Sequence, residues 1–192
     1  MSETLVINTE SGLIEQEEKV NPLPLVNENY PLLYQKIKEY SDVLPNASME
    51  KLVSQMKMTM KLYGGIGLSA NQVGIPCRVF VMGTDDFFIA CINPKVIEQS
   101  EETEIATEGC LSFPALQLKI ERPKWIVAEY TDKDGEIKQQ RFEGMTARCY
   151  LHELDHMNGI CYTSLIKPVA LQLARQKAEK LMKKIIRNQK KK

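Results

Sequence analysis

The sequence predicts an α+β fold in which antiparallel β-sheets pack around a central helix, with a further helix at the C-terminal end. Three observations predict this class. Apolar residues recur at helical spacing from Ala147 to Met157, short β-prone segments fill the middle of the chain, and a second helical pattern follows Pro168. The length of 192 residues and the apolar content of 43% fit one globular domain.

The first third of the chain is predicted to be mainly helical after an acidic arm. Residues 1–20 are polar and acidic, and we expect them to form a flexible arm. A short helix is expected over Tyr30–Tyr40. A longer helix, with Ser48 as its N-cap, carries apolar residues at helical spacing over Met49–Met60 and ends at Gly64-Gly65.

The middle of the chain is predicted to form antiparallel strands. Asn93-Pro94 is typical of a strand end, and Asp134-Gly135 is typical of the turn of a hairpin. The segments rich in β-prone residues predict strands at Cys77–Met82, Phe87–Ile92, Ile105–Thr107, Leu116–Ile120, Trp125–Tyr130 and Glu136–Phe142. The helix that follows Pro168 is rich in lysine and arginine.

Composition excludes several classes of protein. The formal net charge is zero, so no overall field attracts nucleic acid, and we expect no specific DNA binding. No apolar run approaches 20 residues, which predicts no membrane span, and the acidic N-terminus does not resemble a signal peptide. The five cysteines are an odd number, which favours reduced thiols in the cytoplasm.

The segment His152-Glu153-Leu154-Asp155-His156 is the strongest functional signal in the chain. Residues four apart lie on one face of a helix, so His152 and His156 can bind one metal ion. Glu153 is close enough to reach a water molecule at that ion, whereas Asp155 faces away and is expected to be structural. Such a group also occurs by chance on a solvated helix face, and the motif alone leaves that alternative open.

The third metal ligand has to come from elsewhere in the chain. Only two histidines are present, so it must be Cys, Asp or Glu. The longer H-E-x-x-H-x-x-G-x-x-H motif fails because its last position is Tyr162. Peptidases with a glutamate ligand remain an alternative. The most suggestive candidate is Cys110, expected in a loop between strands, although a lone cysteine is more often a buried apolar residue.

The glycine-rich segment Gly65–Gly74 is not a phosphate-binding loop. It lacks the Gly-Lys-Ser/Thr ending of such a loop and the third glycine of a dinucleotide-binding fingerprint. Two interpretations remain. The segment is either a plain turn from helix to strand, or a loop whose backbone contacts a ligand and in which Gln72 presents its amide.

Together these segments resemble the three motifs of the peptide deformylase family, G-x-G-x-A-A-x-Q, E-G-C-L-S and H-E-x-D-H. The resemblance extends from about Asn27 to the end of the chain. It implies that residues 21–187 form one deformylase-like catalytic domain and that residues 188–192 are a basic tail. It also implies which residues bind the metal and which one is the catalytic acid/base: Cys110, His152 and His156 for the metal, and Glu153 for proton transfer.

The resemblance further implies a substrate site. Gln72 and the backbone N–H of Leu111 match the positions that hold the substrate carbonyl oxygen. The other matching positions pair with the peptide backbone or line the methionine pocket, and they are Gly65, Ile66, Gly67, Met145 and Cys149. The implied reaction removes the formyl group from N-formylmethionyl peptides. The implied cofactor is one divalent metal ion, Fe²⁺ first, with Zn²⁺, Ni²⁺ or Co²⁺ as substitutes.

Three positions depart from the family pattern. Ser69 replaces the first alanine of the glycine-rich motif, Leu151 replaces a common glutamine, and Gln117 stands where bacterial members often have arginine. Two alternatives are kept: a metallopeptidase of another H-E-x-x-H family, and an inactive homologue that binds formyl peptides. The family's association with ribosomes suggests that the basic C-terminal helix docks there; a merely solvated helix is the alternative.

Overall fold

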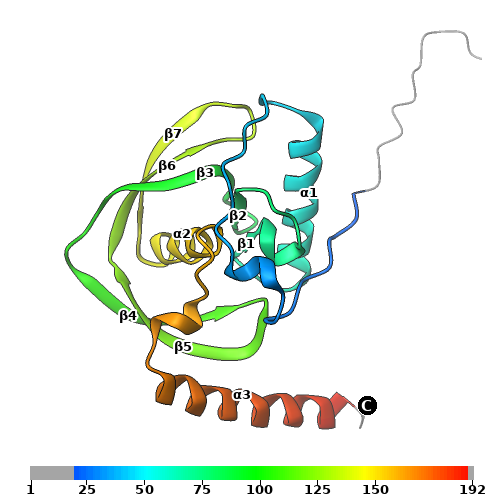
Figure 1. Cartoon of the computed structure of the whole chain (residues 1–192), viewed down its shortest axis with the longest axis vertical. Helices are drawn as coiled ribbons and strands as arrows, with labels where there is room; N and C mark the ends of the chain where they lie inside the picture. Colours follow the sequence, from blue (N-terminus) through cyan, green and yellow to red (C-terminus); the bar gives the residue numbers. More distant parts are fainter. Residues whose placement is uncertain (1–19, 190–192) are drawn as a thin grey trace, which may run out of the picture.

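The computed structural model describes residues 20–189, so the predicted arm and the end of the basic tail lie outside the described residues. Most of the strands follow one another in the middle of the chain, and two of the α-helices come after them (Figure 1). The bounds of the elements, with 3₁₀ helices written η, are η1 (Pro31–Tyr34), α1 (Ala47–Leu62), β1 (Gly67–Ser69), η2 (Ala70–Val73), β2 (Val79–Gly83), β3 (Phe88–Gln99), β4 (Thr103–Cys110), β5 (Phe113–Pro123), β6 (Trp125–Thr131), β7 (Ile137–Glu143), α2 (Gly144–Met157), η3 (Tyr162–Leu165) and α3 (Pro168–Gln189).

Two antiparallel sheets surround α2, which confirms the predicted fold class. One sheet has five strands in the order β1-β2-β3-β6-β7, and the other pairs β4 with β5. Figure 1 shows α2 between the sheets, α1 beside β1 and β2, and α3 below β5. The helix with the histidine motif is therefore enclosed by strands that come from most of the chain.

Strand β2 explains why a nearly continuous apolar run forms a strand here. Its successive side chains point to opposite faces of the sheet. Val79 and Val81 pack on the side of α1, whereas Phe80 and Met82 pack on the side of α2. Both faces are buried, so the strand does not alternate between apolar and polar residues.

Helix α2 ends where its sequence predicts. Asn158 caps it and Gly159 follows with a φ of 73°. The last carbonyl groups receive side-chain donors, because Asn71 Nδ2 lies 2.8 Å from the His156 oxygen and Arg78 Nη1 lies 2.9 Å from the Met157 oxygen. These bonds satisfy groups that a helix end leaves without partners, and they fix the end that carries His156.

Two predictions about the N-terminal part are wrong. The expected helix over Tyr30–Tyr40 is only the 3₁₀ turn η1, since the backbone beyond it pairs with the end of α2, with Ile37 N bonded to Met157 O at 2.9 Å. Helix α1 is capped by Asn46 instead of Ser48. The Asn46 side chain accepts a hydrogen bond of 2.9 Å from Met49 N, and its extended backbone is that of a cap residue.

The strand bounds also differ from the prediction at Asn93-Pro94. Strand β3 continues through this pair to Gln99, and the register against β6 shifts between Ile92 and Lys95. Asn93 has a φ of 51° at this point. The Asn-Pro pair therefore makes an irregularity inside the long strand β3. This irregularity bends β3 from one side of α2 towards β4.

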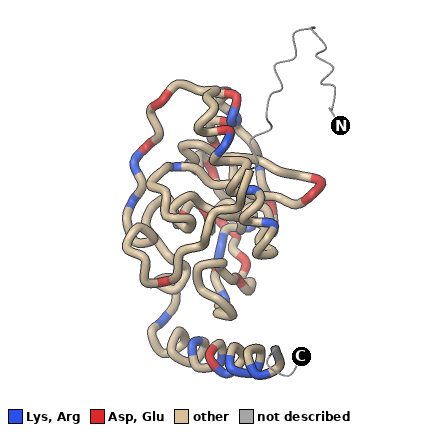
Figure 2. Tube along the Cα trace, turned by 90° about the vertical axis from the view of Figure 1, so that its right-hand side faces the viewer, with Lys and Arg blue, Asp and Glu red and all other residues tan. Residues whose placement is uncertain are grey.

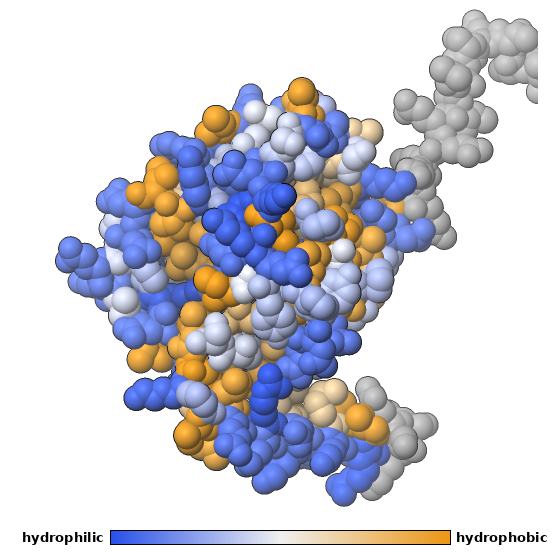
Figure 3. Space-filling view, viewed as in Figure 1, coloured by the Kyte–Doolittle hydropathy of each residue, from blue (hydrophilic) through white to orange (hydrophobic). Residues whose placement is uncertain are grey.

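Helix α3 contacts the body of the molecule through its first half. Leu171, Ala174 and Ala178 pack against a cluster under β5. The second half of α3 is mostly exposed. Basic side chains line the helix, with one acidic residue among them (Figure 2). The face of α3 seen in Figure 3 is largely hydrophilic. The helix reaches Gln189 and so includes the first two residues of the predicted tail. Among the helices of residues 20–189, none has the length and apolarity that crossing a bilayer requires.

Candidate metal centre and active site

The structure brings Cys110, His152 and His156 to one point. Cys110 Sγ and one ring nitrogen of each histidine lie within 4.8 Å of one another. The two rings come from successive turns of α2 and meet edge to face, with centroids 5.1 Å apart. Cys110 lies at the end of β4 instead of in a loop, and the two residues after it turn the chain into β5. Its sulfur is 3.3 Å from His156 Nε2.

Glu108 orients the first histidine, a role that was not predicted for it from the sequence. His152 Nδ1 donates to Glu108 Oε2 at 3.0 Å, which leaves Nε2 of the same ring for the ligand cluster. Glu108 lies two residues before Cys110 on β4, and its side chain is buried. A carboxylate behind a ligating histidine fixes the tautomer and the orientation of the ring. The only available signal was the glutamate of the E-G-C-L-S motif.

Two arginines hold Glu108 in its buried position. Arg122 donates to both carboxylate oxygens at 2.9 and 3.0 Å, and Arg148 adds a bond of 2.8 Å. Arg122 also reaches Asp155 at 2.6 Å, so Asp155 faces away from the ligand cluster as predicted. Burial alone would raise the pKa of Glu108, but hydrogen bonds from His152 and Arg122 lower it to about 2. The carboxylate therefore stays charged.

The charges around the cluster suit a bound cation. Burial would lower the pKa of His152, yet hydrogen bonds with Cys110 and Glu108 raise it to about 10. The environment of this ring thus favours positive charge. Burial and the charge of His152 hold the pKa of His156 well below its ordinary value, which keeps that ring neutral and able to donate a lone pair. A thiol and two imidazoles in this arrangement fit a tetrahedral divalent metal site.

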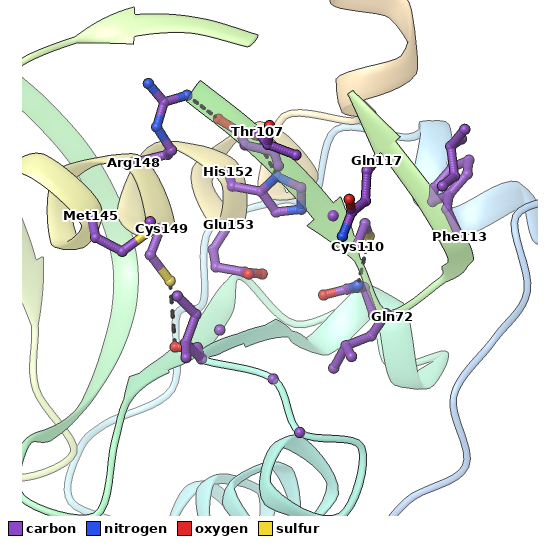
Figure 4. A pocket seen from close by; sticks show the side chains of 18 of the residues that line it. Gln72, Thr107, Cys110, Phe113, Gln117, Met145, Arg148, Cys149, His152 and Glu153 are labelled. Carbon is purple, nitrogen blue, oxygen red and sulfur yellow. Dashed lines mark hydrogen bonds and ion pairs between the residues drawn. The ribbon is translucent and has the colours of Figure 1, made fainter. Parts of the chain in front are cut away.

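Glu153 lies beside the cluster with its carboxylate facing the cavity (Figure 4). Its side chain is only 4% exposed, and the oxygen Oε2 is buried without a hydrogen-bond partner. Burial raises the pKa of Glu153 to about 7, against the lowering effects of His152 and of the nearby Ser69 hydroxyl. A carboxylate with this pKa can both accept and return a proton near neutral pH.

Gln72 reaches the cluster from the opposite side. Its Nε2 lies 3.2 Å from Cys110 Sγ (Figure 4) and also 3.3 Å from Ser112 Oγ. The segment that carries Gln72 is neither a plain turn nor a loop, but the short strand β1 followed by η2. The amide donor is thus held by hydrogen-bonded structure on the cavity side of the cluster.

A cavity of about 430 Å³ joins the cluster to the surface. Every residue predicted for the substrate site lines it, namely Gly65, Ile66, Gly67, Gln72, Leu111, Met145 and Cys149. Gln117, which departs from the family pattern, also lines it (Figure 4), whereas Leu151 does not. The structure therefore collects the predicted substrate residues around one opening that leads to Glu153.

Gly67 must be a glycine for this arrangement to form. A Cβ at Gly67 would lie 2.4 Å from Glu153 Oε1 and 2.7 Å from Cys149 Sγ. Strand β1 is at the edge of the five-stranded sheet, so no strand within residues 20–189 pairs with its outer backbone groups. The missing side chain lets the backbone of this edge approach α2 closely.

A Cys-His-His cluster, a buried glutamate on the same helix and a donor amide around an open cavity define a metal-dependent hydrolase of the H-E-x-x-H class. The comparisons with known proteins narrow this class. The sequence pattern of the family described as polypeptide deformylase matches residues 22–172. The chain belongs to the peptide deformylase family.

Individual relatives agree over most of their length. The peptide deformylase of Thermotoga neapolitana is 43% identical over 130 residues, which are 68% of this chain and 79% of that protein. The crystal structure of the Thermotoga maritima enzyme superposes with a TM-score of 0.73 at 38% identity, covering 77% of this chain and 99% of the other. A Met-Ala-Ser-bound peptide deformylase from Acinetobacter baumannii has a TM-score of 0.73 at 28% identity, covering 77% and 99%.

Proposed function

We propose that this protein removes the formyl group from the N-terminal formylmethionine of new peptides at one divalent metal ion held by Cys110, His152 and His156. The convergence of these three donors beside Glu153 is the observation that carries the proposal. The donor set suits Fe²⁺, Zn²⁺, Ni²⁺ or Co²⁺, and membership of the family favours Fe²⁺. When bound, the ion acts as a Lewis acid that polarises oxygen.

Glu153 is the acid/base of the proposed reaction. It takes a proton from the water that attacks the formyl carbon, the C–N bond then breaks, and Glu153 gives the proton to the leaving amine, so that formate and a free N-terminus result. Its pKa of about 7 suits both transfers. Gln72 Nε2 and the backbone N–H of Leu111 donate to the oxyanion that forms at the formyl oxygen.

The proposed substrate lies along β1. A peptide backbone can extend a sheet by pairing with a free edge, and Gly65, Ile66 and Gly67 offer such an edge at the cavity. Met145 and Cys149, two turns and one turn before His152, then face the methionine side chain. The Acinetobacter baumannii relative binds Met-Ala-Ser, which has the sequence of a deformylated product. Gln117 carries no charge, so we expect no ionic contact from this position to the rest of the peptide.

The proposal also includes a docking partner for α3 and the compartment in which the protein works. Lysines of the exposed half of α3 form a positive surface that suits ribosomal RNA, and docking there would place the enzyme near the emerging chain.

All five cysteines are unpaired, which fits a reducing cytoplasmic compartment.

Turnover of formyl-Met-Ala-Ser by anaerobically purified protein tests the proposal. We expect formate release from this peptide and no cleavage of unformylated Met-Ala-Ser. A metallopeptidase of another family would cleave the unformylated peptide, and an inactive homologue would bind the formyl peptide without releasing formate.

The variant Glu153→Ala tests the assigned acid/base. It should keep one metal ion per chain and lose about 10²- to 10⁴-fold in kcat, because proton transfer typically contributes that much. Glu101→Ala, in the exposed turn before β4, removes the same groups far from the cavity and should retain full activity. Undiminished turnover by Glu153→Ala would show that the assigned role is wrong.

A further inference from the structure

Ser69 carries a buried hydroxyl between Gly67 and Gln72, two residues that line the cavity, at a position where the family motif has alanine. The residue is 0% exposed at the end of β1. The single proton of Oγ is shared between two acceptors, Asn71 Oδ1 at 2.8 Å and Gln72 Oε1 at 3.0 Å. The backbone N–H of Ser69 also donates to Gln72 Oε1, at 3.0 Å. Ser69 thus directs its backbone N–H, and a hydroxyl proton that it shares with Asn71, towards one amide oxygen of Gln72.

This pair of donors fixes which way the Gln72 amide points. With Oε1 bound to Ser69, the NH₂ group faces Cys110 Sγ and Ser112 Oγ on the cavity side. Rotating the amide by half a turn would place its NH₂ against the N–H of Ser69, donor against donor, in a site closed to water. The backbone donor is present with any residue at this position, whereas the second donor exists only because residue 69 has a hydroxyl.

The same hydroxyl connects this loop to the helix with the histidines. Asn71 accepts from Ser69 Oγ and donates through Nδ2 to the His156 backbone oxygen at 2.8 Å. Asn71 is itself fully buried. The contacts therefore run from the Gln72 amide through Ser69 and Asn71 to the end of α2, and they hold the amide donor at a set position relative to His156.

We propose that Ser69 is a positioning residue of the reaction, whose hydroxyl holds the Gln72 amide in the orientation that donates to the oxyanion. The inference rests on the proposed role of Gln72. An amide held in advance in its donating orientation stabilises the transition state without first having to rotate. Because the oxyanion exists only during the reaction, the effect belongs in kcat and not in KM.

Removal of the hydroxyl tests this positioning role. Ser69→Ala should lower kcat for formyl-Met-Ala-Ser by about three- to tenfold, the value of one hydrogen bond, with KM changed less than about twofold. Ser100→Ala is the matched control, because Ser100 is also buried and hydrogen-bonded, between β3 and β4, away from the cavity. Both variants should lower the melting temperature, and only Ser69→Ala should lower kcat.

A double-mutant cycle with Gln72→Ala separates the inference from the proposed function. Gln72→Ala alone should lower kcat by roughly 10²- to 10³-fold. Adding Ser69→Ala to it should then lower kcat no further. If Gln72→Ala leaves kcat unchanged, the oxyanion role of Gln72 fails. If Gln72→Ala lowers kcat but Ser69→Ala does not, or lowers it equally in both backgrounds, only the role of Ser69 fails.

A second variant keeps the test decisive if Ser69→Ala folds poorly. Ser69→Cys keeps a side chain of similar shape but has only a weak donor. We expect a kcat below that of the wild type, with no further loss in the Gln72→Ala background. Wild-type kcat in a folded Ser69→Cys variant would overturn the proposal.

Discussion

At the scale of single residues, the site depends on a buried carboxylate that is not among the predicted metal ligands. Glu108 holds the ring of His152 from behind, and Arg122 and Arg148 keep that carboxylate charged in the interior. Breaking a buried ion pair leaves an uncompensated charge, which is far more costly than losing an exposed pair. The position of the His152 ring therefore depends on the position of Glu108.

The pKa of Glu108 predicts how stability changes in acid. Its folded-state pKa of about 2 lies below the ordinary value of 4.5, so its contribution is fully present above about pH 4.5 and is lost as the pH falls towards 2. At roughly 1.36 kcal/mol per pH unit, this contribution is about 3 kcal/mol. Urea unfolding of the wild type between pH 6 and pH 2.5, with a chelator present to remove metal effects, should show most of this loss.

Glu108→Gln provides the comparison for the acid experiment. It should start less stable near pH 6 and depend less on pH, because it has no proton to bind at this position. Glu101→Gln, in the exposed turn, should follow the wild-type curve. Parallel curves for wild type and Glu108→Gln would contradict the lowered pKa.

Local patterns explain which residues of the site could be predicted from sequence. His152, Glu153 and His156 lie within one helix, so a spacing of four residues already places them on adjacent turns. Cys110 required a motif, and Glu108 could not be assigned a partner because its contact with His152 joins residues 44 positions apart. The hydroxyl of Ser69 could be recognised as a departure, but its partners depend on how η2 folds against α2.

At the scale of elements, periodicity was informative where an element buries a regular face. Helix α1 and helix α2 each bury residues at helical spacing, and both were predicted. The segment Tyr30–Tyr40 has apolar residues at similar spacing, and Leu33 and Ile37 are indeed buried. Its backbone, however, pairs with the end of α2 instead of with itself. Tertiary hydrogen bonds of this kind leave no periodic signal in the sequence.

Helix α3 is the element whose proposed role is easiest to separate from the chemistry. Replacing Lys180, Lys183 and Lys184 with glutamine should weaken co-sedimentation with ribosomes several-fold and flatten its salt dependence, because each lost charge removes a phosphate contact. Deformylation of a free tripeptide should stay unchanged. These side chains are exposed, so the substitutions leave the contacts of Leu171 and Ala174 with the body intact.

The control for the α3 experiment keeps the net charge equal. Lys38, Lys119 and Lys133 lie outside α3, and the same change to glutamine there alters the total charge by the same amount. If both triple variants co-sediment like the wild type, docking through α3 is wrong. If both weaken equally, the attraction is a general effect of charge and not a property of this helix.

At the scale of the whole molecule, the fold places one helix where two sheets meet. The five-stranded sheet brings β1 and Gly67 to one side of α2, and the β4–β5 pair brings Cys110 to another. Segments from residue 64 to residue 153 thus contribute to a single cavity. The fold class could be predicted because the number and kind of elements follow from local pattern. The meeting of the sheets at one point depends on register, which the pattern does not specify.

X-ray absorption at the metal edge of zinc-loaded protein tests the assignment of the three metal ligands. We expect one sulfur at about 2.3 Å and two imidazole nitrogens at about 2.0–2.1 Å from each ion, with the sulfur lost in Cys110→Ser. A first shell without sulfur, or with fewer than two imidazole nitrogens, would contradict the assignment of Cys110, His152 and His156 as the metal ligands.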